Sequence, residues 1–165
     1  MASVALACGR RGVFSVASLS ADEARQIYEV RAALEPAMAR LFIERATTAQ
    51  VEALGAAVAH AESAARAFDG PAYVEAYGAF YDVLLAGSGN DVARRILDTL
   101  DARIMYLRHL TTQRAPLTRK LRTVALMRGI FDATEARTPG LAARRCASFV
   151  ARLASYALDL LAEIG

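Results

Sequence analysis

The sequence predicts an all-α protein, an antiparallel bundle of about six helices joined by short connections. Apolar residues recur with the helical period through most of the chain, and capping residues or Gly/Pro pairs separate the periodic segments. Of the 165 residues, 55% are hydrophobic, and the abundant Ala, Leu, Arg and Glu favour helix. The length suits one domain with a substantial core.

Capping signals mark the first two helices. Ser20 and Glu23 have the spacing of a capping box, which predicts a helix that runs to about Arg45. Pro36 lies inside this helix, so we expect a kink or break in the turn before it. A second capping signal predicts another helix over residues 47–68, with a narrow face rich in alanine.

The third helix carries an unusual stripe of tyrosines. Pro71, directly after Asp69 and Gly70, restarts the chain as a helix that runs to about Ala86. Within it Tyr73, Tyr77 and Tyr81 recur every four residues and therefore share one face. These rings either fill a core or line a cavity.

The second half of the chain predicts three more helices. Asn90 caps the fourth helix, after which a loop is expected at residues 112–116. A fifth helix covers about residues 117–136, and the last begins at Pro139. The apolar stripe of the fourth helix is predicted to consist of Val92, Ile96, Leu100, Ile104, Leu107 and Thr111.

Composition and motifs exclude several classes of function. The net charge of +3 is small, and 17 acidic residues are interspersed with the basic ones, so the balance alone does not indicate nucleic-acid binding. Phosphate-binding loops, nucleophile motifs and metal-ligand pairs are missing, so we predict no catalytic residues and no enzyme. No apolar run approaches the ~20 residues of a membrane helix. We expect a cytoplasmic protein without a membrane partner.

Four passages of the sequence resemble the effector-binding and oligomerisation (FCD-type) domain of GntR/FadR-family transcription regulators. They are residues 28–35, residues 44–47, residues 80–90 and the closing pair of helices. The resemblance covers about residues 20–164, so we assign residues 20–165 to this domain. Residues 10–16 alternate like a short strand. By resemblance, residues 1–19 are a remnant of the wing and linker of a winged helix-turn-helix domain, most of which is missing.

The resemblance also implies where a metal would bind. Many members of the family hold a divalent metal through one aspartate and three histidines. Tyr77, Tyr81, Met127 and Phe149 stand at the corresponding positions of this chain. None of these side chains is a plausible ligand for a hard or borderline cation. We therefore expect no metal and no cofactor.

An effector pocket is predicted around these positions, lined by Arg31, Tyr77, Tyr81, Arg103, Met127 and Phe149. The two arginines would satisfy the tyrosine hydroxyls or hold an anionic head group, and Arg31 would have to pair with Glu35 if that face is buried. By resemblance, the partners are a small carboxylate or acyl effector and a second copy in a homodimer, with DNA bound only through the missing domain. Alternatively the rings fill the space, and the chain is a ligandless truncated paralogue that acts as a dimerisation module.

Overall fold

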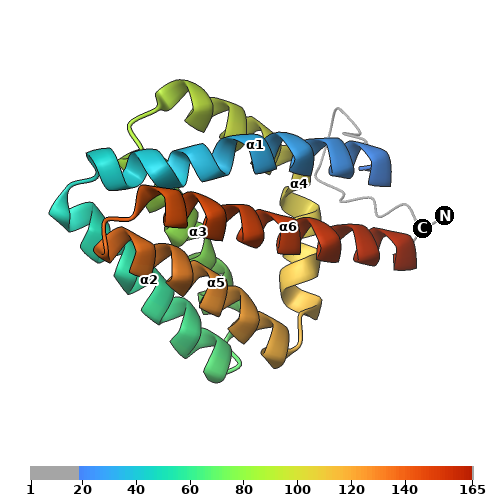
Figure 1. Cartoon of the computed structure of the whole chain (residues 1–165). Helices are drawn as coiled ribbons and strands as arrows, with labels where there is room; N and C mark the ends of the chain where they lie inside the picture. Colours follow the sequence, from blue (N-terminus) through green and yellow to red (C-terminus); the bar gives the residue numbers. More distant parts are fainter. Residues whose placement is uncertain (1–18, 165) are drawn as a thin grey trace, which may run out of the picture.

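A computed structural model describes residues 19–164, which form six α-helices and no strand (Figure 1). The predicted all-α bundle is therefore confirmed. The strand predicted at residues 10–16 lies outside the described residues. The helices are α1 (Ala21–Arg45), α2 (Thr48–Arg66), α3 (Gly70–Gly87), α4 (Asp91–Arg114), α5 (Leu117–Glu135) and α6 (Pro139–Ile164).

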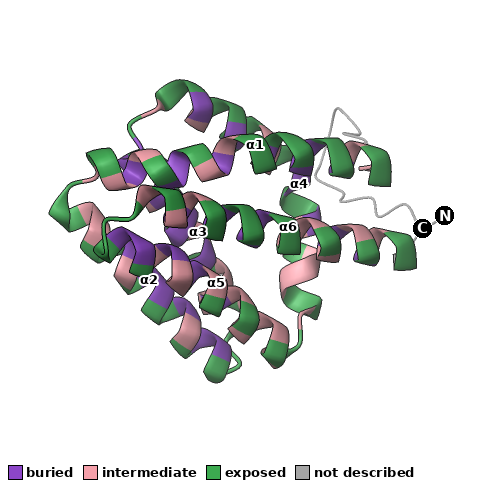
Figure 2. Cartoon of the chain, in the orientation of Figure 1, coloured by how far each residue is buried: buried purple, intermediate pink, exposed green. Residues whose placement is uncertain are grey.

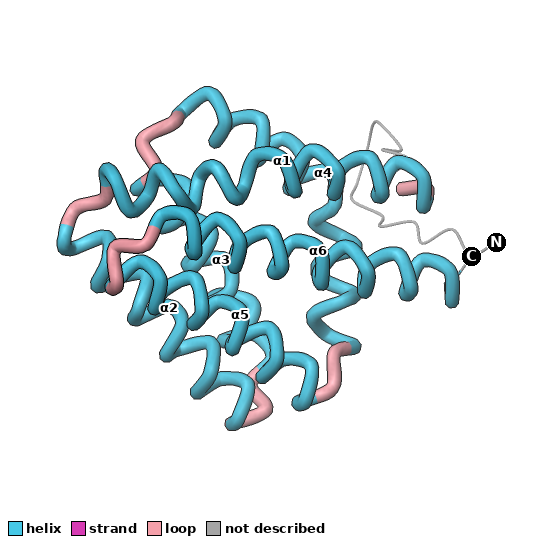
Figure 3. The backbone as a smooth tube through the Cα atoms, viewed as in Figure 1, coloured by secondary structure: helices cyan, strands magenta, loops and turns pink. Residues whose placement is uncertain are grey.

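The last helix closes the bundle against the first. α6 lies between α1 and α5 and runs antiparallel to both, while α2 packs against α3 and α5 (Figure 1). The connections between helices are short (Figure 3). α4 crosses behind α1 and α6 and brings its C-terminal end to the start of α5 (Figure 1). None of the six helices is long and apolar enough to cross a membrane.

The helices bury a main core and a smaller second cluster, of Met38, Leu85, Ala93 and Leu97, on their inward faces (Figure 2). The alanine-rich face predicted for α2 is buried and lets that helix approach its neighbours closely. Larger aromatic and aliphatic side chains are buried across the helices. The largest of those that are almost fully buried are Phe42, Phe80, Phe149, Met38, Leu54, Leu84, Ile104, Met127 and Ile130.

The predicted capping residues start their helices. The Ser20 hydroxyl accepts a hydrogen bond from the Glu23 amide at 3.0 Å, and Thr47 with Gln50 forms a complete capping box. Asn90 likewise caps α4. The Glu23 carboxylate accepts hydrogen bonds from Arg103 of α4, at 2.6 and 3.0 Å. This carboxylate ties the start of α1 to α4.

Three details of the sequence prediction are wrong. α1 is continuous through Pro36, so no break occurs there. In α4 the first turns bury Ala93 and Leu97, whereas Val92 and Ile96 are 61% and 44% exposed. The helix also continues to Arg114, which leaves only two residues of the predicted loop between α4 and α5. Both ends of α4 therefore differ from the predicted pattern, because periodicity cannot tell a core face from an exposed apolar one.

The turn between α3 and α4 is held by the end of α1. The Arg45 guanidinium donates hydrogen bonds to the carbonyls of Ser88 and Gly89, both at 3.2 Å. Gly89 adopts a φ of 62°, the left-handed conformation that glycine tolerates. Two of the passages that carry the family resemblance, residues 44–47 and 80–90, thus meet in space.

We expect Gly87→Ala to destabilise the protein by about 1–3 kcal/mol, because a Cβ atom there overpacks the core. It would lie 2.4 Å from Cε2 and 2.6 Å from Cδ2 of Phe42, whose ring is fully buried. Gly78→Ala on the same helix is the control, since its Cβ would meet nothing within 4 Å. Helix propensity should make that change stabilising by up to about 1 kcal/mol. Equal denaturation midpoints for the two variants would contradict the close contact at Gly87.

Phe68→Gly should stabilise the protein by about 1 kcal/mol. Phe68 follows α2 with a φ of 58°, and its ring is 77% exposed. Its amide and that of Asp69 bond back to Ala65 and Ala64, which is the Schellman pattern that favours glycine. Phe68→Ala keeps the left-handed strain and is the matched control. Chemical denaturation should show a gain in stability for the glycine variant only.

Candidate functional site

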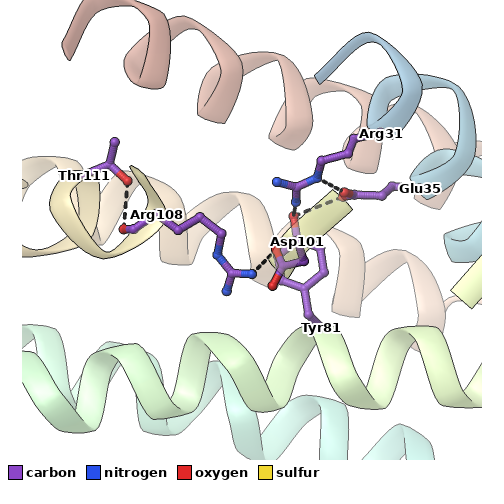
Figure 4. A network of polar contacts seen from close by, with 6 residues as sticks. All are labelled: Arg31, Glu35, Tyr81, Asp101, Arg108 and Thr111. Atoms are coloured by element: carbon purple, nitrogen blue, oxygen red, sulfur yellow. Dashed lines mark hydrogen bonds and ion pairs between the residues drawn. The ribbon is translucent and has the colours of Figure 1, made fainter. Parts of the chain in front are cut away.

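A buried ionic network joins α1 to the tyrosine face of α3 (Figure 4). Arg31 Nε donates to Glu35 Oε1 at 2.5 Å, and Arg31 Nη2 donates to the Tyr81 hydroxyl at 2.8 Å. That hydroxyl in turn donates to Glu35 Oε2 at 3.0 Å. Arg31 and Glu35 are 2% and 1% exposed. The predicted pairing of these two residues is present, and Tyr81 completes a closed triangle of three polar groups.

One atom of this network has no partner. Arg31 Nη1 is buried, and no acceptor among the described residues bonds it. In Figure 4 this end of the guanidinium carries no dashed line. Arg31 lines a small cavity of about 40 Å³, together with Tyr81 and Arg108. A buried donor of this kind favours an acceptor from a water molecule or a ligand.

The rings at the four metal-ligand positions close the centre of the bundle. The Tyr81 and Phe149 ring centroids are 5.8 Å apart, and Tyr77 lies 5.4 Å from Tyr81 and 6.2 Å from Phe149. Met127 is fully buried in the same core. Burial raises the pKa of both tyrosines, so the phenols stay protonated at neutral pH. These four side chains do not fit a metal ion.

Within residues 19–164, no group of three or more His, Cys, Asp or Glu side chains could hold a metal.

A larger cavity of about 310 Å³ lies beside this aromatic centre. Its inner wall is formed by the rings of Tyr28, Tyr73 and Tyr77. Burial raises the pKa of Tyr28 to about 12, so this phenol too is neutral. The other walls come from the C-terminal end of α4, the start of α5 and the second half of α6. These walls carry several hydroxyl groups, those of Thr111, Thr112, Thr118, Thr123, Ser155 and Tyr156.

Cations dominate the charge of this larger cavity. Among residues 19–164, Asp159 is the one acidic residue that lines it. The basic residues that line it are Arg108 from α4, Arg119, Lys120 and Arg122 from α5, and Arg152 from α6. Positive charge from three helices around one opening raises the local concentration of anions. The cavity is therefore suited to an anionic ligand that also accepts hydrogen bonds.

Arg108 links the larger cavity to the ionic network, since it lines both cavities. Its side chain is 19% exposed and pairs with Asp101 (Figure 4). The guanidinium also lies 5.0 Å from the ring centroid of Tyr77 and 5.6 Å from that of Tyr81. Burial alone would lower the pKa of Arg108, but Tyr77 and Asp101 outweigh it and raise the pKa. Arg108 therefore remains a cation at the inner end of the cavity.

The structure separates the residues predicted for the effector pocket into four groups. Tyr77 lines the larger cavity, and Arg31 and Tyr81 line the small one. Met127 and Phe149 are buried in the core and line neither cavity. Arg103 lies on the outer side of α4, half-exposed and paired with Glu23.

Sequence reasoning missed the cations of the larger cavity. Arg108 lies off the apolar stripe predicted for the fourth helix, and the basic run that begins at Arg119 forms no recognised motif. That run contains Lys120, the only lysine of the chain, and it starts three residues after Pro116, at the beginning of a predicted helix. Its density of charge was the available signal.

The structure is thus an all-α domain with a cation-lined cavity between α4, α5 and α6. The family model described as "FCD domain" matches residues 26–152, well over half of the chain. The chain therefore belongs to the FCD domain family, as the resemblance indicated.

A solved structure, a GntR protein of Streptococcus agalactiae, is similar in fold, with a TM-score of 0.67 and 24% sequence identity. The match covers 80% of this chain and 58% of that chain, so the present chain spans little more than half of the solved regulator. At this identity the likeness shows the fold alone. No curated protein matches the chain.

Proposed function

We propose that this chain is a metal-free effector sensor whose ligand is a small carboxylate or acyl compound held in the larger cavity. The observation that carries the proposal is Arg108, a largely buried cation at the inner end of a cavity lined by tyrosines and hydroxyls. A carboxylate there would accept charge-assisted hydrogen bonds from the guanidinium. The polar walls favour a short carboxylate over a long acyl chain.

The residues predicted for the pocket keep distinct roles in this proposal. Tyr77 contacts the effector. Arg31 and Tyr81 line the small cavity on the other side of Arg108 and hold its guanidinium in position. Met127 and Phe149 hold the tyrosines in place from the core. Arg103 acts outside the pocket, where it fastens α4 to Glu23 of α1.

Ligand binding would reach α4 through Arg108. A carboxylate at the guanidinium competes with Asp101, which lies seven residues earlier on the same helix. Loss of this ion pair changes the contacts along the outer part of α4 but leaves the buried triangle of Arg31, Glu35 and Tyr81 intact. The effector thereby favours one arrangement of α4 over another, which is the requirement for a ligand-driven switch.

A thermal-shift screen in EDTA tests the proposal. We expect at least one short carboxylate to raise the melting temperature, since a ligand at 100 times its Kd adds about 2.7 kcal/mol of stability. For a domain of this size that corresponds to several degrees, at roughly 2–4 °C per kcal/mol. Fatty acids and acyl-CoA compounds form the comparison arm. Stabilisation that appears only after a divalent metal is added would contradict the metal-free site.

The exposed face of α4 supports a homodimer as the working form. Val92, Ile96 and Tyr106 recur at helical spacing on one side of α4 and are 61%, 44% and 62% exposed. Exposed apolar side chains aligned in this way favour burial against a partner. We propose that a second copy covers this face. DNA would be contacted by a winged helix-turn-helix domain rather than by the six helices.

Light scattering tests the dimer directly. Wild-type protein should have the mass of a dimer, and Ile96→Asp should give a folded monomer because the charge cannot be buried in an interface. Glu75→Asp on an exposed position of α3 should leave the dimer unchanged. A wild-type monomer at high concentration would contradict the proposal. A dimer that binds none of the anions would instead indicate a ligandless dimerisation module.

A further inference from the structure

The outer end of the larger cavity carries its own cluster of arginines. Arg119 and Arg122 are one turn apart on α5, and Arg152 faces them from α6. The Arg119 guanidinium lies 3.2 Å from the ring centroid of Tyr156, which fixes its position. Arg122 and Arg152 are exposed, whereas Arg108 at the other end is largely buried. The cavity thus has cations at an inner end and at an outer end.

These outer cations are not neutralised by the protein. In the part of the chain that the structure describes, no hydrogen bond or ion pair joins Arg119, Arg122 or Arg152 to a carboxylate. Partial burial lowers the pKa of Arg119; Tyr156 and Asp159 oppose this shift, and the neighbouring charges of Arg122 and Arg152 add to it. The three arginines therefore repel one another, and an anion between them would relieve the repulsion.

The start of α5 adds to the positive potential at this cavity. Pro116 occupies the N-cap position, and no side chain caps the helix. Ala115, Pro116 and Thr118 line the same cavity, so the uncapped first turn lies in its wall. The amides of an uncapped first turn carry partial positive charge. This effect supports the arginine cluster but would not by itself define a site.

We propose that the effector is a dianion, with one anionic group at Arg108 and a second held at the outer end by Arg119, Arg122 and Arg152. This inference rests on the proposed function, because it concerns the ligand of the same cavity. The shared chemistry is a carboxylate at the inner end and a carboxylate or phosphate-like group at the outer end. A monocarboxylate would neutralise the inner cation and leave the outer cluster unpaired.

A matched ligand series tests the inference by calorimetry. Pentanoate carries one carboxylate, glutarate carries two on a chain of equal length, and 4-phosphonobutyrate replaces one carboxylate of glutarate with a phosphonate. We expect the dianions to bind at least about tenfold more tightly than pentanoate. The second anionic group would accept an extra pair of charge-assisted hydrogen bonds, which contribute a gain in affinity of this size. The stronger of the two dianions identifies the outer group as carboxylate or phosphate-like.

The double variant Arg122→Gln/Arg152→Gln locates the second group. Both side chains are exposed, so the variant should fold, and its melting temperature checks this. It should lose about tenfold in affinity for the dianion and change little toward pentanoate. Arg144→Gln/Arg145→Gln, exposed on α6 and outside the cavity, should leave both affinities unchanged.

The outcomes separate this inference from the proposed function. If pentanoate and the dianions bind equally well, or if the double variant binds dianions as tightly as wild type, the dianion inference is wrong while the carboxylate site stands. If none of the three anions binds, both are wrong.

Discussion

Glu35→Ala is expected to lower the free energy of unfolding by about 3–5 kcal/mol, the range found when one partner of a buried ion pair is removed. Glu35 accepts hydrogen bonds from both Arg31 and Tyr81 and is 1% exposed. Without this carboxylate the Arg31 guanidinium stays buried with no counter-charge, and the Tyr81 hydroxyl loses its acceptor. Urea denaturation followed by circular dichroism measures the loss.

Glu44→Ala provides a matched control for this measurement. Arg40 and Glu44 form an Arg–Glu pair with the same spacing on the same helix, but their side chains are 53% and 43% exposed and the distance is 3.4 Å. An exposed ion pair contributes about 0–1 kcal/mol, so the free energy of unfolding of Glu44→Ala should stay close to that of wild type. If Glu35→Ala cost no more than Glu44→Ala, the buried network would have no role in stability.

The second large effect is expected on ligand binding. Arg108→Met should weaken binding of the carboxylate effector by about 100-fold, since truncating a buried charged partner costs 2–5 kcal/mol or more. Methionine keeps much of the apolar stem against Tyr77 and Tyr81, so the fold should persist. Asp101 is 41% exposed and can be solvated once its partner is gone.

Arg94→Met on the same helix is the control for Arg108. Arg94 is 39% exposed and approaches Asp98 only to 3.8 Å, outside both cavities. Calorimetric titration of the two variants with glutarate should show the loss at Arg108 alone. If wild type and Arg108→Met bound glutarate with equal affinity, Arg108 would not be the inner anion site.

The sequence was most informative where local chemistry decides the structure. Ser20, Thr47 and Asn90 each cap a helix as predicted, because an N-cap hydrogen bond spans only three residues. Pro36 shows the limit of such local rules. The first helix continues through it, since the buried residues on both sides stabilise the helix more than one missing amide weakens it.

The orientation of α4 could not be predicted from periodicity. Val92 and Ile96 fit an apolar stripe, yet Ala93 and Leu97 face the core. A helix with apolar residues on two faces gives two acceptable rotations, and only tertiary packing selects one. The same ambiguity affects the arginines of this helix. Arg103, which was predicted to line the pocket, pairs with Glu23 and lines neither cavity, whereas Arg108 lines both.

Only the part of the candidate site that follows from spacing along a helix could be predicted from the sequence. The i,i+4 spacing of Arg31 and Glu35 indicated their ion pair, and the tyrosine stripe indicated a partner hydroxyl, which Tyr81 supplies. The larger cavity is assembled from the ends of α4, α5 and α6, and no local pattern specifies how such ends meet. Its cations could be recognised only after the helices were in place.

The most direct test of the central claim is a crystal structure of the EDTA-treated protein with the anion that stabilises it most. The claim is that an anion binds without metal between α4, α5 and α6, at Arg108. We predict ligand density in that cavity with a carboxylate in hydrogen-bond contact with the Arg108 guanidinium. A ligand or a metal ion at the centre formed by Tyr77, Tyr81 and Phe149 would contradict it.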